Sequence, residues 1–132
     1  MCYNNHCEVM KLNIHESAED YLERILMLSK KMSKVRSIDI AVDMNYSKPS
    51  ISRAIKNLKE NGYINVDANG NITLTEKGFE IANRIFERHT ILTKIFVALG
   101  VSQETAASDA CKVEHDLSQE TFDALKKYLE KK

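Results

Sequence analysis

Hydrophobic positions follow helical spacing over most of this chain. In the first such run, apolar side chains recur every three or four residues: Tyr21, Leu22, Ile25, Leu26, Leu28 and Met32. Ser17 precedes the run and has a side chain suited to an N-cap. Residues 1–16 show no periodicity, so we expect a flexible arm there, followed by an amphipathic helix from about residue 17 to residue 32.

Two short helices on either side of a tight turn are predicted next. The first is expected over residues 37–44, with Ile38, Ala41 and Val42 facing inward. The second is expected over residues 48–61, where apolar side chains again repeat at helical spacing. Two consecutive short helices separated by a turn are typical of a helix-turn-helix.

A β-hairpin and three further helices complete the pattern. Short strands at 63–66 and 72–74 flank Asn69-Gly70, a residue pair typical of tight hairpin turns. Further helices are predicted at about 75–99, 102–116 and 118–130. This order predicts a mainly α protein, with a winged helix-turn-helix over residues 17–75 and a helical domain over residues 76–132.

Composition restricts the class of protein further. The chain has 132 residues, 43% of them hydrophobic, enough for one or two small domains. It has neither an apolar run long enough for a membrane span nor a signal-peptide core, so we expect a cytoplasmic protein that does not bind membranes. Its three cysteines show no framework spacing, and we expect no structural disulfide.

Charge is distributed unevenly along a chain whose formal net charge is zero. Between Lys30 and Glu60 there are eight Lys and Arg residues against three acidic ones. A basic segment in a neutral chain predicts that one surface has an anionic partner. A lysine-rich face exposed to solvent is the alternative explanation.

The second short helix has the composition of a DNA-reading helix. Hydroxyl groups and cations suited to base edges and phosphates occupy its outward positions and its start. With Arg36, which precedes the helix-turn-helix, we predict these DNA-binding residues: Arg36, Ser47, Lys48, Pro49, Ser50, Ser52, Arg53 and Lys56. Ser47 also has a plain role as the helix cap, and Pro49 fits the first turn. Asn69-Gly70 carries no cation, and a helix-turn-helix module reused for protein contacts is the alternative.

Candidate metal ligands lie at helical spacing in two other places. Cys111, Glu114 and His115 stand at positions i, i+3 and i+4, which share one helix face. Asp20 and Glu23 repeat this spacing in the first predicted helix. With His89 in the long helix, six groups that bind divalent transition metals would converge if these helices met.

Each of these residues also has a plain alternative role. Asp20 fits a capping box begun by Ser17, and Cys111 fits a small buried apolar position. Glu23 and Glu114 are of a type usually exposed on helices, and a lone histidine such as His89 is more often a hydrogen-bonded residue at the edge of a buried helix face than a ligand. Only the joint pattern favours a metal site.

Five segments also resemble a known family: Asp20-x-x-Glu23, Ser47-Lys48-Pro49-Ser50-Ile51-Ser52, Thr75-Glu76-Lys77-Gly78, Arg88-His89 and Cys111-x-x-Glu114-His115-x-Leu117-Ser118. They look like the diphtheria-toxin-repressor family of iron- and manganese-dependent transcriptional repressors, over roughly residues 17–130. The resemblance implies a homodimer that binds a double-stranded DNA operator, with metal between the DNA-reading and dimerisation parts. The ligands it implies are Asp20, Glu23, His89, Cys111, Glu114 and His115.

Two departures from the family pattern concern the choice of metal. The chain stops at Lys132, so it resembles the two-domain manganese-type branch, as does Asp20. Cys111, in contrast, is the iron-type choice, while Thr93 and Ala107 replace partners of the iron-type ancillary site. We therefore expect one Mn²⁺ or Fe²⁺ per chain, with Zn²⁺ or Co²⁺ binding possible in vitro.

The sequence thus predicts a metal-sensing repressor of metal-uptake genes, with no small-molecule substrate. The competing hypothesis is a winged-helix regulator that senses a small ligand or oxidation at Cys111 without metal. An enzyme with Glu114 as a base needs a substrate cleft, for which a short helical chain offers little material, and we predict that the protein is not an enzyme.

Overall fold

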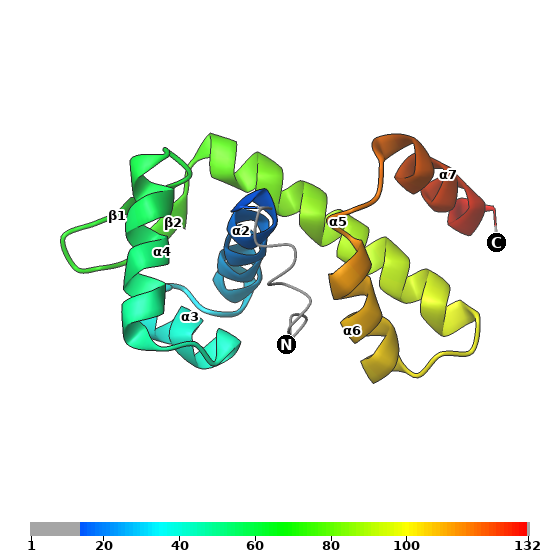
Figure 1. Ribbon diagram of the computed structural model, residues 1–132, viewed down its shortest axis with the longest axis horizontal. Helices are drawn as coiled ribbons and strands as arrows, with labels where there is room; N and C mark the ends of the chain where they lie inside the picture. Colours follow the sequence, from blue (N-terminus) through cyan, green and yellow to red (C-terminus); the bar gives the residue numbers. More distant parts are fainter. Residues whose placement is uncertain (1–13, 132) are drawn as a thin grey trace. The chain divides into compact units, whose positions relative to one another are not determined.

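The computed structural model describes residues 14–131, with side chains described from Ser17 onward. The part of the predicted arm at residues 1–13, with Cys2, His6 and Cys7, lies outside the described residues. Two compact units divide the described chain, one ending at Asn83 and the other beginning at Arg84. The fold is mainly α with one hairpin, as predicted (Figure 1).

The N-terminal unit begins with three helices. Helix α2 spans Ile14–Lys31, α3 spans Ser37–Met44 and α4 spans Lys48–Glu60. Asn45 ends α3 in the left-handed conformation with φ 58°, which asparagine tolerates better than most residues. The Ser47 side chain accepts a hydrogen bond from the Ser50 amide and caps α4, as predicted.

The first helix starts earlier than the sequence indicated. Helix α2 begins at Ile14, so Ser17 lies inside it and is not its N-cap. Helix propensity is too weak to fix a boundary to within a turn, and here the helix extends into the segment that was expected to be an arm. Asp20 therefore lies in the second turn of α2, which removes the capping box as an explanation for it.

A two-stranded hairpin follows α4. Strand β1 (Ile64–Val66) pairs antiparallel with β2 (Ile72–Leu74). The Asp67 carboxylate accepts hydrogen bonds from the amides of Asn69 and Asn71, at 2.8 and 2.9 Å. The Gly70 amide donates to the Asp67 carbonyl, and Gly70 has a φ of +85°. The hairpin was predicted correctly, and its loop is organised by Asp67 around a glycine that allows the positive φ.

The core of the N-terminal unit lies among its helices and the hairpin. Its buried apolar residues include Leu22, Ile25, Leu26, Val35, Ile40, Ala41, Met44, Ile51, Ile55, Leu58, Ile64 and Ile72. The inward face predicted for α3 was wrong in part. Ile38 is 46% exposed and Val42 is 74% exposed, whereas Ile40 and Met44 are buried. Apolar side chains cover more than half of the circumference of this short helix, so its packing against α2 and α4 decides which part of that surface is buried.

Three helices form the rest of the chain. Helix α5 (Glu76–Ala98) begins in the N-terminal unit, where Thr75 accepts a hydrogen bond from the Gly78 amide, and it continues into the C-terminal unit. Helix α6 spans Gln103–Val113 and α7 spans Gln119–Glu130. Within the C-terminal unit, Lys126 of α7 forms an ion pair with Glu87 of α5 at 2.6 Å. No helix among residues 14–131 is long and apolar enough to cross a membrane.

Candidate metal site and nucleic-acid interface

Glu114 is the centre of a buried polar cluster in the C-terminal unit. It is fully buried and follows the last residue of α6, with helical backbone angles. Its Oε1 lies 3.0 Å from His89 Nδ1 of α5, and its Oε2 lies 3.5 Å from His115 Nε2. Burying a carboxylate is costly unless positive charge or donors compensate for it. The sequence correctly grouped these three residues, although α6 ends at Val113, so His115 lies in the turn after the helix.

Cys111 adds a sulfur atom to this cluster. It lies one turn before Glu114 in α6, is 6% exposed, and has a potential ligand atom within 4.8 Å of one from Glu114. Metal binding through Cys111 requires the thiolate form of this cysteine.

Arg88 fixes the turn that carries these ligands. Its guanidinium is buried and donates to the carbonyls of Glu114 at 3.0 Å and Leu117 at 2.7 Å. It also donates to Gln119 Oε1 at 3.2 Å and lies 5.4 Å from the Phe122 ring centre. These contacts hold α5 to the α6–α7 turn. Sequence reasoning noticed Arg88 only as part of the Arg88-His89 pair and missed this role.

Thr93 has a separate role inside α5. It is buried, and its hydroxyl donates a hydrogen bond of 2.7 Å to the His89 carbonyl one turn earlier. A hydroxyl used in this way supports the helix at His89. It does not supply the carboxylate that the iron-type ancillary site would have at this position.

The two remaining ligand candidates belong to the N-terminal unit. Asp20 and Glu23 lie one turn apart on α2, and they are 5% and 3% exposed. Between them, Tyr21 stacks edge-to-face on Tyr46, with ring centres 6.2 Å apart, which connects α2 to the turn before α4. Burial, followed by the effects of Tyr46 and Asp20, raises the pKa of Tyr21 to about 12. The carboxylates of α2 are thus close in sequence to a contact with the helix-turn-helix.

Side chains that bind transition metals therefore occur in both units. The C-terminal cluster combines a carboxylate, two imidazoles and a thiol, and α2 presents two carboxylates on one face. Such a mixed set suits Mn²⁺, Fe²⁺, Co²⁺ or Zn²⁺ better than Ca²⁺ or Mg²⁺, which prefer oxygen alone. The residues present fit a divalent transition metal.

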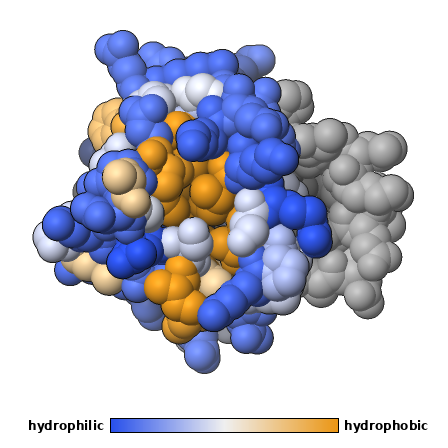
Figure 2. All heavy atoms as spheres, turned by 90° about the vertical axis from the view of Figure 1, so that its left-hand side faces the viewer, coloured by the Kyte–Doolittle hydropathy of each residue, from blue (hydrophilic) through white to orange (hydrophobic). Residues whose placement is uncertain are grey.

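The predicted reading helix exposes its polar side. Lys48, Ser52, Arg53 and Lys56 are exposed, while Ile51 and Ile55 on the other side are buried. Figure 2 views the molecule from the side on which the hairpin and α4 lie in Figure 1, and the surface there is largely hydrophilic, with a group of hydrophobic side chains near its centre. A cationic helix surface of this kind is suited to a phosphate backbone.

The guanidinium of Arg36 lies beside the β1–β2 hairpin, the wing of the winged helix, whose tip residues Asn69 and Gly70 carry no cation. Arg36 precedes α3, and its guanidinium lies beside Gly70, where an added Cβ would be 3.2 Å from Nη2. The neighbouring Val35 pairs with Ile72 of β2 through a 2.7 Å hydrogen bond. Arg36 is thereby placed at the wing, a position that sequence spacing alone did not indicate.

The fold and these two features define a winged-helix DNA-binding protein with a cluster of metal-type donors. Comparison with known families agrees with this class. Residues 13–71 match the family model described as the iron dependent repressor N-terminal DNA-binding domain. Residues 75–132 match the metal-binding and dimerisation domain of the same family. The chain belongs to the iron-dependent repressor family, the family of the diphtheria toxin repressor.

Individual relatives cover most of the chain. It is 39% identical over 119 residues to an uncharacterised helix-turn-helix transcriptional regulator of Methanocaldococcus jannaschii, covering 88% of this chain and 94% of that one. It is 32% identical to the transcriptional regulator MntR of Escherichia coli O6:H1, covering 94% of this chain and 80% of MntR.

Solved structures agree at the level of the fold. A manganese-dependent transcriptional repressor in complex with manganese is 27% identical, with a TM-score of 0.78, over 86% of this chain and 52% of that one. The manganese regulator SloR is also 27% identical, with a TM-score of 0.75, over 86% of this chain and 53% of SloR. This chain thus spans about half the length of these solved relatives. It is a metal-dependent, DNA-binding transcriptional repressor of a manganese- and iron-sensing family, and not an enzyme.

Proposed function

We propose that this protein is a homodimeric, cytoplasmic repressor that binds operator DNA when one Mn²⁺ or Fe²⁺ per chain is bound and thereby controls metal-uptake genes. The proposed ligands are Asp20, Glu23, His89, Cys111, Glu114 and His115. The observation that carries the proposal is the fully buried Glu114 carboxylate between two imidazoles. When bound, the ion supplies positive charge that carboxylates of the N-terminal and C-terminal units can share.

The proposed metal ligands come from both halves of the chain. Asp20 and Glu23 lie on α2, whose Tyr21 contacts Tyr46 in the turn before the reading helix. His89 and Glu114 lie in the part that matches the metal-binding and dimerisation domain. Ligands drawn from both halves would limit the positions that α4 takes relative to the dimer. If operator DNA binds one of these positions better, metal and DNA each favour the binding of the other.

The choice of metal follows from the donors. Asp20, Glu23 and Glu114 are hard oxygen donors that suit Mn²⁺, whereas reduced Cys111 is soft and favours Fe²⁺, Zn²⁺ or Co²⁺. A glutamate at position 111 could bridge two Mn²⁺ ions, and a thiolate is a poorer bridge between hard ions. We therefore assign one ion per chain.

Dimerisation is proposed through the far ends of α5 and α7. Leu99 is 76% exposed and Tyr128 is 57% exposed, and both line an apolar pocket with Ile95, Ala98 and Leu129. Contiguous apolar surface of this kind marks interaction sites. Leu99→Asp should convert a dimer to monomers in sedimentation experiments, and a variant that stays dimeric would place the interface elsewhere.

The DNA interface is proposed to use three parts of the N-terminal unit. Ser47 caps α4, and Pro49 and Ser50 lie in its first turn, where small side chains permit close approach to DNA. Lys48, Ser52, Arg53 and Lys56 form its exposed face. Arg36 at the wing supplies a cation for the phosphate backbone.

A regulator that senses oxidation at Cys111 without metal is the second candidate. The position of Cys111 favours it, because this buried sulfur lies within 4.8 Å of a Glu114 carboxylate oxygen and its oxidation would change the cluster around Glu114. This candidate predicts DNA binding that responds to reductants and is indifferent to chelators.

Metal titration of reduced protein distinguishes the two. Glu114→Gln should lower Mn²⁺ affinity at least about 100-fold, because it removes the anionic donor at the centre of the cluster. Asp109→Asn is the matched control, since Asp109 is exposed on the same helix, and its Mn²⁺ affinity should equal that of the wild type. Equal Mn²⁺ affinity in both variants would refute the proposed site.

A further inference from the structure

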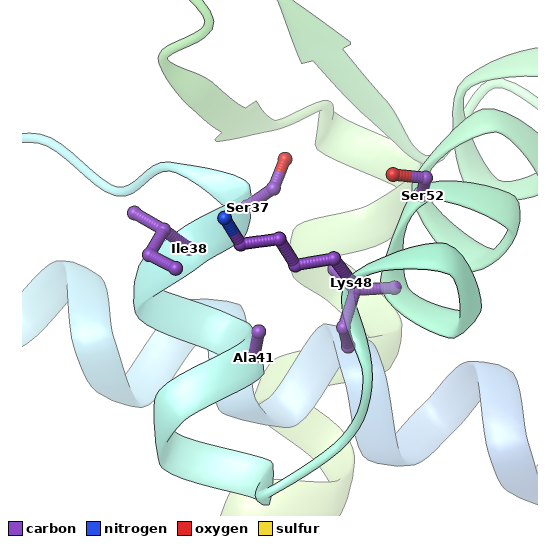
Figure 3. A pocket seen from close by; sticks show the side chains of 6 residues that line it. Ser37, Ile38, Ala41, Lys48 and Ser52 are labelled. Carbon is purple, nitrogen blue, oxygen red and sulfur yellow. The ribbon is translucent and has the colours of Figure 1, made fainter.

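An apolar cavity opens between the two helices of the helix-turn-helix. It is lined by Ser37, Ile38, Ala41, Lys48, Ile51 and Ser52. Its volume is about 170 Å³, and it is partly open to solvent. Figure 3 shows its two sides, with Ser37, Ile38 and Ala41 on α3 and Lys48 and Ser52 on α4. The cavity therefore adjoins the surface of α4 that carries the proposed DNA-reading residues.

The residues that line the cavity form an apolar interior and a polar edge, and this combination indicates what kind of ligand fits there. Ile38, Ala41 and Ile51 provide an apolar interior. Ser37, Ser52 and the ammonium of Lys48 provide a polar, cationic edge, and Figure 3 shows the Lys48 side chain extending toward Ser37. A ligand that fits both must place a small apolar group inside and an anionic group beside it.

Double-stranded DNA has one such pair of groups in its major groove. The C5-methyl of thymine is the apolar group that a base pair presents there, and phosphates flank it along the same strand. Arg53 and Lys56 extend the cationic surface of α4 beyond the cavity, so the charge near the opening favours an anionic polymer.

We propose that this cavity receives the C5-methyl group of a thymine, with Ile38 as a specificity-determining residue. The proposal rests on the proposed DNA interface and adds one base preference to it. It also accounts for the exposure of Ile38, whose 46% exposed side chain lies on a face that the helical pattern assigned to the core. Contact with a methyl group would remove that apolar surface from water when DNA binds.

Uracil substitution tests the proposal, because uracil differs from thymine only by the missing methyl group. Mn²⁺-loaded, reduced protein would first select duplexes from a random library, and the tightest duplex would be remade with each thymine replaced by uracil in turn. One position in each half-site should then bind about 4-fold more weakly, the ratio expected for about 0.8 kcal/mol per buried methyl group. With Ile38→Ala, the difference between thymine and uracil at that position should fall below about 2-fold.

Val42→Ala is the matched control. Val42 is a more exposed apolar residue of the same helix, and it is not among the residues that line the cavity. This variant should keep the 4-fold effect. The proposal is overturned if no position responds to uracil, or if the response persists in Ile38→Ala. If the wild type selects no duplex at all, the DNA interface itself fails, an outcome distinct from tight binding that ignores the methyl group.

Discussion

Arg88 offers the sharpest test of how the C-terminal unit holds its ligands. The change Arg88→Met keeps an unbranched apolar side chain over Phe122 but removes the guanidinium. The carbonyls of Glu114 and Leu117 then lose donors at 3.0 and 2.7 Å. Leaving a buried acceptor unsatisfied costs about 1–3 kcal/mol. For two carbonyls we expect a loss of about 2–6 kcal/mol in the free energy of unfolding, a large share of the ~5–15 kcal/mol typical of a domain.

The same change should also weaken metal binding. Arg88 contacts the backbone of Glu114, so it positions the ligand and is not itself expected to touch the ion. Loss of such a supporting contact typically lowers metal affinity about 10–100-fold. Arg88→Lys should recover only part of both losses, because an ammonium lacks the planar fork that reaches two carbonyls.

Two measurements and one control complete this test. Urea unfolding of chelated protein gives the stability, and Mn²⁺ titration of the folded, reduced variant gives the affinity. Lys94→Met removes an exposed cation from the same helix and should change neither. An Arg88→Met variant that unfolds at the wild-type urea concentration and binds Mn²⁺ normally would refute the positioning role.

Three further predictions concern single side chains. Arg53→Ala should weaken specific DNA binding by about 1–3 kcal/mol, whereas Lys56→Ala should weaken binding to all sequences and lower its salt dependence; unchanged binding in both variants would place the reading surface elsewhere. Reduced wild-type protein with Co²⁺ should show a sulfur-to-metal charge-transfer band that Cys111→Ser abolishes, and absence of the band in the wild type would remove Cys111 from the ligand set. Hydrogen bonds from Asn71 and Asn69 lower the pKa of Asp67. The hairpin should therefore be stabilised at pH values above the ordinary aspartate pKa, and it should lose this stabilisation as the pH falls through the lower pKa that Asp67 has in the folded protein. A normal Asp67 pKa in an NMR titration would contradict this.

Elements with strong local signals were predicted well from the sequence. Ser47 with Pro49 marked the start of α4, and Asn69-Gly70 marked the hairpin. The face of α3 was predicted less well, because Ile38 and Val42 are apolar yet exposed. In a helix of eight residues, tertiary packing outweighs the hydrophobic pattern.

The candidate site shows a similar division. Helical spacing grouped Cys111 with Glu114, because i and i+3 positions lie close together wherever the backbone is helical. It could not place Arg36 beside Gly70, which depends on the pairing of Val35 with Ile72. Contacts between segments far apart in the sequence leave no spacing signal, so the structure was needed to find them.

The central claim is that metal and operator DNA favour each other's binding. The direct measurement is the affinity of reduced protein for its selected duplex, under anaerobic conditions, in chelator and then with Mn²⁺ or Fe²⁺. A coupling free energy of about 1–3 kcal/mol predicts roughly 5–150-fold tighter binding with metal, while the chelated protein remains folded. Equal affinity of the chelated and metal-loaded protein for the duplex would contradict the account.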